Sequence, residues 1–419
     1  MYKATLEYAQ QLDKEDQLSY LRDQFHIPKD KEGSDWLYFT GNSLGLQPKQ
    51  TQQYIQQELD DWAKFGVEGH FEAKNPWMPY HEFLTEKMAT IVGAKPLEVV
   101  VMNTLTTNLH LLMVSFYQPT KKKYKIVIES DAFPSDRYAV QSQLKFHGFD
   151  PEEGLVEWKP REGEELLRIE DLEQIVSEQG DEIALLLIGG VNYYTGQYLD
   201  LKRIAEIGHA KDCFVGIDLA HGAGNISPEL HESGVDFAAW CTYKYLNSGP
   251  GSLAGLFVHE KHAHNKELPR FAGWWNHNKE TRFNMRQPFD VMAGGEGWQL
   301  SNPPILSMAA IRSSLDLFDK VGMKALREKS ESLTGYFEFL VNQIDTDRIK
   351  VITPSNPKER GCQLSIQVRN ADKSLHHKLT KKNVITDWRE PDVIRCAPVP
   401  MYNSFEDVFR MVEILKGLL

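Results

Sequence analysis

Two charged side chains stand in otherwise apolar surroundings between Phe214 and Gly255. Asp218 directly follows the apolar residues FVGI, and Lys244 follows the apolar run FAAWC after two further residues. A charge in such a run is costly unless it is paired or has a chemical role. Because each lies where a predicted strand gives way to a glycine-bearing turn, the spacing predicts a site built at the ends of two neighbouring strands.

The residue types of this pair favour imine chemistry on a pyridine ring. An apolar surrounding lowers the pKa of a lysine amine, which must be partly deprotonated to form an imine. The ordinary role of a lysine at a strand end is to extend its charged head into water, so Lys244 alone assigns nothing. A carboxylate such as Asp218 can keep a pyridinium nitrogen protonated, which maintains the ring as an electron sink. Asp218 could instead bind magnesium, but no second acid lies near it in the sequence.

A candidate anion site stands at the start of a predicted helix in NTLTTNLHLLMVSFY. Leu105, Leu109, Leu112 and Phe116 form one apolar stripe at helical spacing. Threonines at positions 104, 106 and 107 crowd the first turn, where backbone N–H groups have no helical acceptor. Capping explains one threonine, and three favour a phosphate held by these donors and the helix dipole.

The elements that must position these residues alternate between strand and helix. Apolar segments at YKIVIES, EIALLLI, FVGI, FAAWC and LAGLFV are predicted strands, and patterns of helical spacing separate several of them. This alternation predicts an α/β fold with a mainly parallel sheet sandwiched by helices. Ligands of such sheets bind outside the carboxyl ends of the strands. We therefore expect Asp218, Lys244 and the threonine-rich turn to meet at one edge.

The pattern changes after residue 305. Residues 306–345 are mostly helical with a break near Gly322, and two short strands and a last helix follow. Ser404 and Asp407 form a predicted capping box at the start of that helix. We predict a large cofactor-binding domain over residues 50–305, and a smaller α+β domain built from residues 1–49 and 306–419.

Composition narrows the class of protein. The chain has 419 residues, with 47 Lys plus Arg against 59 Asp plus Glu, for a net charge of -12. This balance disfavours a nucleic-acid or anionic-membrane partner. The four cysteines lack CxxC spacing and are expected to be reduced. The N-terminus has no apolar signal segment and the longest apolar run is too short to span a bilayer, so we expect a soluble cytoplasmic protein.

Two other clusters do not fit familiar motifs. Gly249, Gly251 and Gly255 miss the GxGxxG spacing of a dinucleotide site by one position, and Pro250 intrudes. The histidines of HEKHAH, at positions 259, 262 and 264, miss HExxH spacing by one residue. We predict no metal site and interpret these histidines as surface residues without an assigned role.

Eight segments, taken in order, resemble the kynureninase family. They are YFTGNSLGLQP, NTLTTNLHLLM, FPSDRYA, YYTGQ, GIDLAHGAGN, CTYKYLNSGPG, SNPPIL and RCAPVPMYNSF, from about residue 36 to residue 405. The resemblance implies pyridoxal 5'-phosphate on the fold-type-I (aspartate-aminotransferase-like) architecture, in a homodimer with shared active sites. The implied reaction is hydrolysis of the Cβ–Cγ bond of L-kynurenine or 3-hydroxy-L-kynurenine to anthranilate or 3-hydroxyanthranilate and L-alanine. The implied setting is tryptophan catabolism or NAD biosynthesis.

The same resemblance implies a role for each matching residue. Lys244 would carry the cofactor and move protons, Asp218 would pair with the ring nitrogen, and Tyr243 would act as an acid. The implied cofactor-binding residues are Leu105, Thr106, Phe133, Pro134, Ser135, Asp136, Asp218, His221, Tyr243, Lys244, Trp274 and Asn302, with Trp274 and Asn302 supplied by the partner subunit. The implied substrate-binding residues are Arg395, for the α-carboxylate, with His70, Ser43 and Asn302. Gly189 departs from relatives that carry a small hydroxyl residue there, so it is not included.

Two alternatives stay open at this point. One is another fold-type-I enzyme, a cysteine desulfurase or an aminotransferase; a desulfurase needs a mobile cysteine nucleophile, and the sequence offers no evident candidate. The other is a non-catalytic protein on the same fold that acts as a regulator, although no basic DNA-reading domain is attached.

Overall fold

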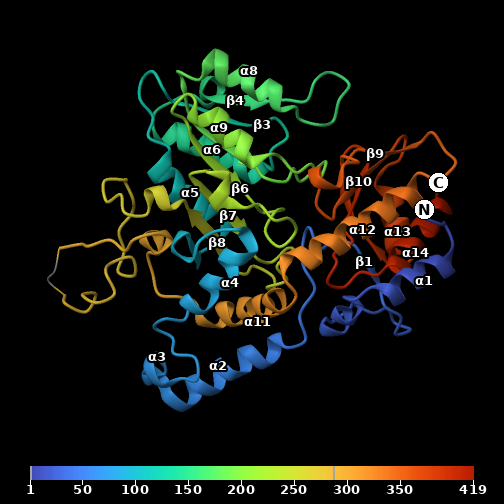
Figure 1. Cartoon of the computed structure of the whole chain (residues 1–419), viewed down its shortest axis with the longest axis horizontal. Helices are drawn as coiled ribbons and strands as arrows, with labels where there is room; N and C mark the ends of the chain where they lie inside the picture. The colour runs from blue at the N-terminus through green and yellow to red at the C-terminus, as the bar shows by residue number, and fades with distance from the viewer. Residues whose placement is uncertain (1, 286–287) are drawn as a thin grey trace.

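The computed structural model describes residues 2–285 and 288–419, which form two lobes (Figure 1). The larger lobe surrounds a seven-stranded sheet, and the smaller lobe surrounds a four-stranded sheet. Both chain termini lie in the smaller lobe. The first and last parts of the chain therefore fold together, while the middle of the chain builds the larger lobe.

The large sheet is mainly parallel, as the alternating pattern predicts. Its order is β2-β8-β7-β6-β5-β3-β4, and only β8 runs antiparallel to its neighbours in these described strands. The strands are β2 (Val99–Met102), β3 (Lys125–Glu129), β4 (Leu155–Trp158), β5 (Ile183–Gly189), β6 (Phe214–Asp218), β7 (Phe237–Cys241) and β8 (Ala254–Val258). The two edge strands, β2 and β4, are absent from the prediction.

Helices cover both faces of this sheet. The packing of α5 (Leu105–Phe116) and α6 (Pro134–Phe146) buries one face. The other face is covered by α4 (Glu82–Val92), α8 (Ile169–Gln179), α9 (Leu201–His209) and α11 (Ile305–Val321). Because both faces are buried, the central strands are almost continuously apolar, which is typical of parallel sheets. The predicted stripe on α5 is confirmed, since Leu109, Leu112 and Phe116 are fully buried.

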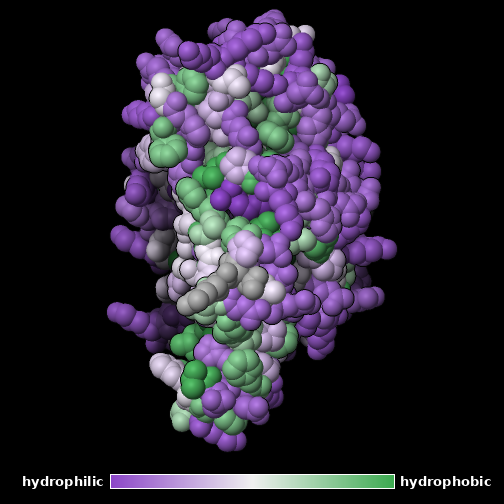
Figure 2. All heavy atoms as spheres, turned by 90° about the vertical axis from the view of Figure 1, so that its left-hand side faces the viewer, coloured by the Kyte–Doolittle hydropathy of each residue, from purple (hydrophilic) through white to green (hydrophobic). Residues whose placement is uncertain are grey.

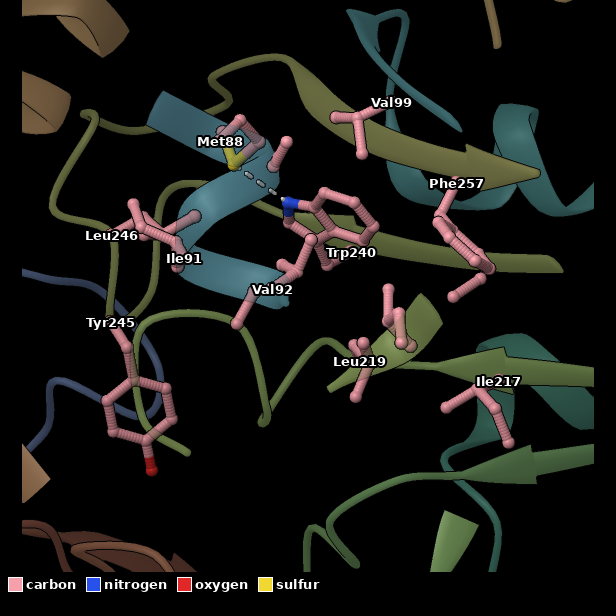
Figure 3. Packing of buried hydrophobic residues seen from close by; sticks show 14 of the residues in the cluster. Met88, Ile91, Val92, Val99, Ile217, Leu219, Trp240, Tyr245, Leu246 and Phe257 are labelled. Carbon is pink, nitrogen blue, oxygen red and sulfur yellow. Dashed lines mark hydrogen bonds between the residues drawn. The ribbon is translucent and has the colours of Figure 1, made fainter. Parts of the chain in front are cut away.

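Trp240 anchors the contact between the sheet and α4 (Figure 3). Its Nε1 points toward Met88 of α4, at 3.3 Å from the sulfur. On the neighbouring strand Gly255 pairs with Trp240, and a Cβ atom at position 255 would lie 2.1 Å from the indole ring. Glycine is therefore required at this position, because any side chain would displace a buried aromatic ring. This packing fixes β7, which leads directly into Lys244.

The smaller lobe is an α+β unit. Its antiparallel sheet has the order β12-β13-β10-β9. The strands are β9 (Ile349–Val351), β10 (Leu364–Val368), β12 (Asp387–Arg389) and β13 (Val393–Cys396), with β1 (Leu37–Tyr38) and β11 (Val384–Ile385) as a separate parallel pair. The helices are α1 (Leu6–Glu15), α12 (Met323–Val341), α13 (Lys373–Thr380) and α14 (Phe405–Lys416). The predicted Ser404–Asp407 capping box is present at the start of α14.

The predicted break near Gly322 is confirmed, because α11 ends at Val321 and α12 begins at Met323. The division near residue 305 stays a prediction. Figure 1 shows α11 beside α2 (Thr51–Phe65) and α4 under the larger lobe, whereas α12 runs into the smaller lobe. We propose that the chain passes between the two domains at Gly322, so that α11 belongs with the large sheet.

The remaining elements are short. They are α3 (Gly69–Glu72), α7 (Pro151–Gly154) and α10 (Leu230–Ser233), with single 3-10 turns at Ser19–Gln24, Gly66–Glu68, Pro96–Glu98, Glu260–His262, Gly295–Trp298 and Pro357–Glu359. At the N-terminus, α1 ends at Glu15 and the 3-10 segment Ser19–Gln24 continues the chain. Among the described residues, the structure contains no helix with the length and apolar character needed to cross a membrane.

Candidate active site

A cavity opens at the carboxyl ends of the parallel strands, where the sequence predicts it. Among the residues that line it are Leu105, Thr106, Phe133, Ser135, Asp136, Asp218, His221, Tyr243 and Lys244. The register of the sheet explains the convergence, since Gly189, Asp218 and Ala239 lie side by side on β5, β6 and β7. Lys244 lies three residues beyond the end of β7.

A tight loop contact shapes the turn that carries Lys244. The backbone N–H of Gly45 donates to the carbonyl of Tyr243 at 2.8 Å, and the N–H of Asn247 donates to the carbonyl of Lys244 at 3.0 Å. A Cβ atom at position 45 would lie 2.3 Å from the Lys244 carbonyl oxygen. Glycine is needed there because the backbone of the TGNSLG loop packs directly against the turn.

Lys244 and His221 are in direct contact. Nζ of Lys244 lies 3.1 Å from Nε2 of His221, and His221 is buried. Burial lowers the pKa of His221 well below its usual value, and the positive charges of Lys244, Arg395 and Arg389 lower it further. The neutral imidazole therefore accepts a hydrogen bond from Lys244. Its Nδ1 is buried without a hydrogen-bond partner in the described part of the chain.

Three acids gather at the floor of the cavity. Burial raises the pKa of Asp218, although a hydrogen bond from the backbone N–H of Ala220, at 2.6 Å, and the charge of Lys244 oppose this. Burial, followed by the charge of Asp218, raises the pKa of Asp136 well above its usual value. Burial also raises the pKa of Glu129 to about 7. This group of acids fits a ligand that brings a positively charged nitrogen to Asp218.

Another part of the cavity lining suits a phosphate. The first turn of α5 faces it, with Thr104, Leu105 and Thr106 among the lining residues. Thr104 is the N-cap residue but makes no side-chain capping bond, and the hydroxyl groups of Thr106 and Ser135 lie 2.8 Å apart. Free backbone N–H groups at a helix start bind anions well.

An aromatic wall completes the cavity. Phe133 lies with its ring centroid 6.0 Å from Nζ of Lys244, and Tyr193 packs edge-on against Phe133 at 5.4 Å. A planar pyridine ring carrying a phosphate would find an aromatic face, an acid for its nitrogen, a lysine amine and a helix N-terminus around it. The residues present therefore fit pyridoxal phosphate.

Some predicted site residues do not line this cavity. Trp274 and Asn302 are exposed in the segment between β8 and α11. His70 lies in α3, where its Nδ1 pairs with the Val67 carbonyl at 2.8 Å and its ring packs on Trp77. Pro134 is also exposed, at the first turn of α6. Their implied roles stay predictions.

A second group of side chains beside the cavity contains two of the predicted substrate-binding residues, Arg395 and Ser43. Arg395 of β13 is buried, and its Nη1 donates to the backbone carbonyl of Tyr193 at 2.5 Å. Ser43 donates to Asp387 at 3.0 Å, and Asp387 also pairs with Arg395. Arg395 thus contacts Tyr193, which lines the cavity.

Sequence reasoning missed several residues that line the cavity, among them Glu129, Gly189, Asn192 and Tyr193. The acid that ends the apolar run YKIVIE is a signal of the same kind as Asp218, and it could have pointed to Glu129. Gly189 lines the cavity although the sequence analysis leaves it out. Its backbone N–H donates to Glu129 at 2.9 Å, and a Cβ atom at position 189 would lie 2.7 Å from the same carboxyl oxygen.

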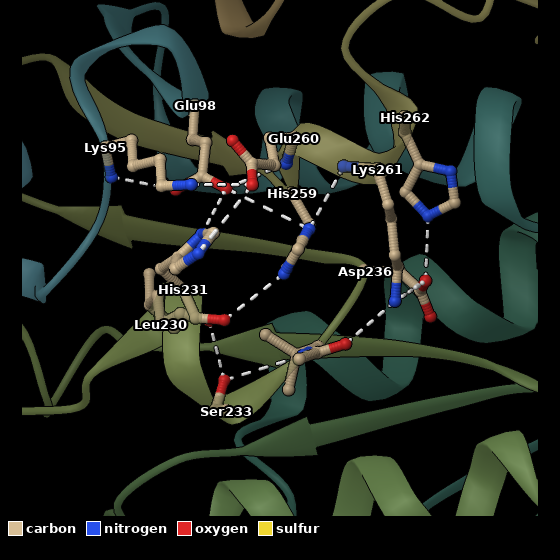
Figure 4. A network of polar contacts seen from close by, with 12 residues as sticks. Lys95, Glu98, Leu230, His231, Ser233, Asp236, His259, Glu260, Lys261 and His262 are labelled. Carbon is tan, nitrogen blue, oxygen red and sulfur yellow. Dashed lines mark hydrogen bonds and ion pairs between the residues drawn. The ribbon is translucent and has the colours of Figure 1, made fainter.

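The histidines near residue 260 belong to a polar network away from the cavity (Figure 4). His262 pairs with Asp236 at 2.8 Å, and His259 accepts from the backbone N–H of Lys261 at 3.1 Å. Glu98, which is buried, accepts from His231 at 2.9 Å. Glu98, His231 and His259 are close enough to share an ion, but each already makes one of these hydrogen bonds within the protein. We interpret the network as structural.

Comparison with known proteins identifies the family. Residues 326–415 match the model of the kynureninase C-terminal domain. A kynureninase of Myxococcus xanthus is 56% identical over 100% of this chain and 98% of its own length. The kynureninase of Koribacter versatilis is 54% identical, over 98% of this chain and 97% of its own. The kynureninase of Mus musculus is 48% identical, over 98% of this chain and 92% of its own.

Solved structures share the fold at low sequence identity. The cystine C–S lyase C-DES, in complex with cysteine persulfide, superimposes with a TM-score of 0.78 at 16% identity, covering 91% of this chain and 98% of its own. An apo cysteine desulfurase from Thermococcus onnurineus gives a TM-score of 0.76 at 17% identity, covering 96% and 97%. These likenesses confirm the predicted fold-type-I architecture. The family follows from full-length identity to the curated relatives: this chain belongs to the kynureninase family.

Proposed function

We propose that this chain hydrolyses the Cβ–Cγ bond of L-kynurenine or 3-hydroxy-L-kynurenine. The products are L-alanine and anthranilate or 3-hydroxyanthranilate, and one water molecule is consumed. The observation that carries the proposal is the juxtaposition of Lys244, Asp218 and the first turn of α5 in one cavity, within a chain that matches kynureninases over its full length.

The cavity residues would hold pyridoxal phosphate, which withdraws electrons from the substrate when bound. Nζ of Lys244 would hold the cofactor covalently, and Asp218 would keep a proton on its ring nitrogen. Backbone N–H groups of Leu105 and Thr106 would bind the phosphate, together with Ser135, which lies beside Thr106. Phe133 would offer its aromatic face to the cofactor ring.

The chain's own side chains then move the protons of the reaction. Nζ of Lys244 would act as the base that removes the proton from the substrate α-carbon. The hydroxyl of Tyr243, whose pKa is raised by burial and by Cys241, stays protonated at neutral pH and donates its proton at the substrate ketone oxygen. Arg395 binds the α-carboxylate through a bidentate pair of N–H groups. This arrangement directs the breaking of a carbon–carbon bond.

The proposal includes a homodimer located in the cytoplasm. Exposed aromatic side chains cluster in the segment after β8, where Phe271, Trp274 and Phe283 are 55%, 44% and 57% exposed. Figure 2 shows the face of the molecule from which this segment projects. Hydrophobic side chains form patches on that face. Burying these rings against a second copy would bring Trp274 and Asn302 toward the partner's cofactor. Free thiols at all four cysteines support a reducing compartment.

The cysteine desulfurase alternative is not favoured. Cys213, Cys241, Cys362 and Cys396 are all buried. Burial raises the pKa of each of these thiols, so none has the exposed, ionised character of a nucleophile.

The test is an assay of product formation. Purified protein loaded with pyridoxal phosphate is incubated with L-kynurenine, and anthranilate is followed by fluorescence while L-alanine is quantified separately. We expect the two products in equal amounts; absence of both from fully loaded protein would refute the proposal. Running 3-hydroxy-L-kynurenine in parallel gives the kcat/KM ratio that defines the preferred substrate.

A further inference from the structure

A single carboxylate sits at the centre of the proposed carboxylate subsite. Asp387 of β12 lies directly opposite Arg395 of β13 in the antiparallel ladder. Directly opposed residues of a ladder place their side chains on the same face, and Asp387 accepts a charge-assisted hydrogen bond from Nη2 of Arg395. The orientation of Arg395 is therefore tied to Asp387.

The same carboxyl oxygen has two further donors. Nη2 of Arg389 lies 3.1 Å from Oδ2 of Asp387, and the hydroxyl of Ser43 lies 3.0 Å from it. Arg395, Arg389 and Ser43 thus converge on one oxygen atom from three segments of the chain. Arg395 is 1% exposed and Asp387 is 15% exposed, so water screens this group only partly.

This group adjoins the cofactor cavity through Tyr193. Nη1 of Arg395 donates to the Tyr193 carbonyl at 2.5 Å. The guanidinium carbons of Arg395 and Arg389 lie 5.7 Å and 6.0 Å from the centroid of the Tyr193 ring. Tyr193 in turn packs against Phe133, so a substrate seated over Phe133 would present its carboxylate to both guanidinium groups.

The charges of the subsite set which ligands it can neutralise. Two guanidinium groups facing one carboxylate leave a single positive charge, which one substrate carboxylate balances. Without the charge of Asp387, two positive charges would remain, and a dicarboxylate would balance them better. We propose that Asp387 is a specificity-determining residue that limits the subsite to one carboxylate and so favours monocarboxylate amino acids over dicarboxylates. This inference rests on the proposed function, in which Arg395 receives the substrate α-carboxylate.

A purely structural role would have a different signature. If the Asp387–Arg395 pair only stabilised the hairpin, its loss would weaken all amino-acid ligands together. Specificity is a difference of affinities, so the ratio of two dissociation constants separates the two roles. If Arg395 is less well positioned in the variant, both dissociation constants rise by the same factor, and this factor cancels in the ratio.

The experiment measures binding of L-alanine and L-aspartate to the protein loaded with pyridoxal phosphate. Dissociation constants come from the absorbance change of the bound cofactor, and therefore need no turnover of kynurenine. In Asp387→Asn we expect the ratio of the two constants to shift toward L-aspartate by about tenfold or more, since removing one adjacent charge alters ligand discrimination strongly in a poorly screened site. A ratio within about twofold of wild type would overturn the inference.

Two further variants complete the design. Arg389→Gln removes one positive charge from a side chain that is 33% exposed, so it is expected to fold, and the ratio should shift in the opposite direction, against L-aspartate. Asp392→Asn is the matched control, because Asp392 lies in the same hairpin but pairs with Gln367, and it should keep the wild-type ratio. A shift of equal size in Asp392→Asn would also overturn the inference.

The outcome distinguishes this inference from the proposed function. If wild-type protein binds neither amino acid and does not cleave kynurenine, the proposed function fails and the inference fails with it. If wild type cleaves kynurenine and the ratio is unchanged in Asp387→Asn and in Arg389→Gln, only the inference fails.

Discussion

The amine of Lys244 lies 3.1 Å from Nε2 of His221. At this distance the two side chains do not both carry a positive charge. His221 is the neutral partner, because burial and the nearby positive charges lower its pKa well below the usual value. A neutral His221 can accept a hydrogen bond from Lys244 and hold its amine toward Phe133 and Asp218. The pair therefore positions the amine without adding a second cation.

The neutral state of His221 predicts how stability depends on pH. In the unfolded chain a histidine titrates near pH 6.5, and its pKa is lower in the folded protein. Below about pH 6.5 the unfolded chain gains a proton that the folded chain does not, so stability that is complete above this pH is lost as the pH falls toward the folded pKa. His221 therefore lowers the free energy of unfolding by up to about 1.4 kcal/mol for each pH unit below about 6.5, and His221→Gln should remove this contribution.

Urea unfolding of wild type and His221→Gln at several pH values between about 5 and 8 measures the effect. His264→Gln, which alters an exposed histidine, is the control and should follow wild type. If the free energy of unfolding falls equally in wild type and in His221→Gln at acid pH, then His221 is not held neutral.

Glu129 should have the opposite pH dependence. Burial raises its pKa from 4.5 to about 7, and the charge of Asp218 adds to this. Between these values the folded chain keeps a proton that the unfolded chain releases, so the stability of the folded protein falls as the pH rises from 4.5 to about 7 and then stays level. Glu129→Gln should be more stable than wild type by roughly 3 kcal/mol above pH 7, and by little near pH 4.5.

Thermal unfolding of the cofactor-free protein at acid and alkaline pH tests this expectation. Glu157→Gln, which removes an acid that pairs with Arg137 and Lys159, should give no such gain. An alkaline stability of Glu129→Gln at or below that of wild type would mean that the Glu129 carboxyl ionises without penalty.

Tyr243 and Tyr245 allow a matched test of the proposed acid. Tyr243 lines the cavity, whereas the Tyr245 hydroxyl is buried without a hydrogen-bond partner among the described residues. Tyr243→Phe should lower kcat for L-kynurenine by about 100-fold or more, since a positioned acid contributes on that scale. Tyr245→Phe should leave kcat within about twofold, because it removes a hydroxyl with no hydrogen bond to lose. Equal kcat values in the two variants would exclude Tyr243 as the acid.

Much of the fold and part of the site could be predicted from the sequence. Asp218 and Lys244 stood out because each is a charge at or shortly after the end of an apolar strand, and parallel strands present their carboxyl ends at one edge. The helix break at Gly322 and the capping box at Ser404 are local signals, and both are confirmed. Features of this kind depend on neighbours in the chain, which the sequence shows directly.

Other features depend on pairings between distant segments. The contact of Glu129 with Gly189 requires β3 and β5 to be neighbours, and the pairing of Asp387 with Arg395 requires the register of the β12–β13 hairpin. Tyr193 lines the cavity because of the path that the loop after β5 takes. No local pattern encodes these contacts, so sequence reasoning alone could not find them.

Borohydride trapping shows directly whether Lys244 holds the cofactor. Reduction of the protein loaded with pyridoxal phosphate fixes any bond between a lysine and the cofactor, and peptide mapping then locates the label. We predict a pyridoxyl group on the peptide that contains CTYKYLNSGPG, at Lys244, and no such label in Lys244→Ala. A label on another lysine, or none on wild-type protein, would show that Lys244 does not hold the cofactor.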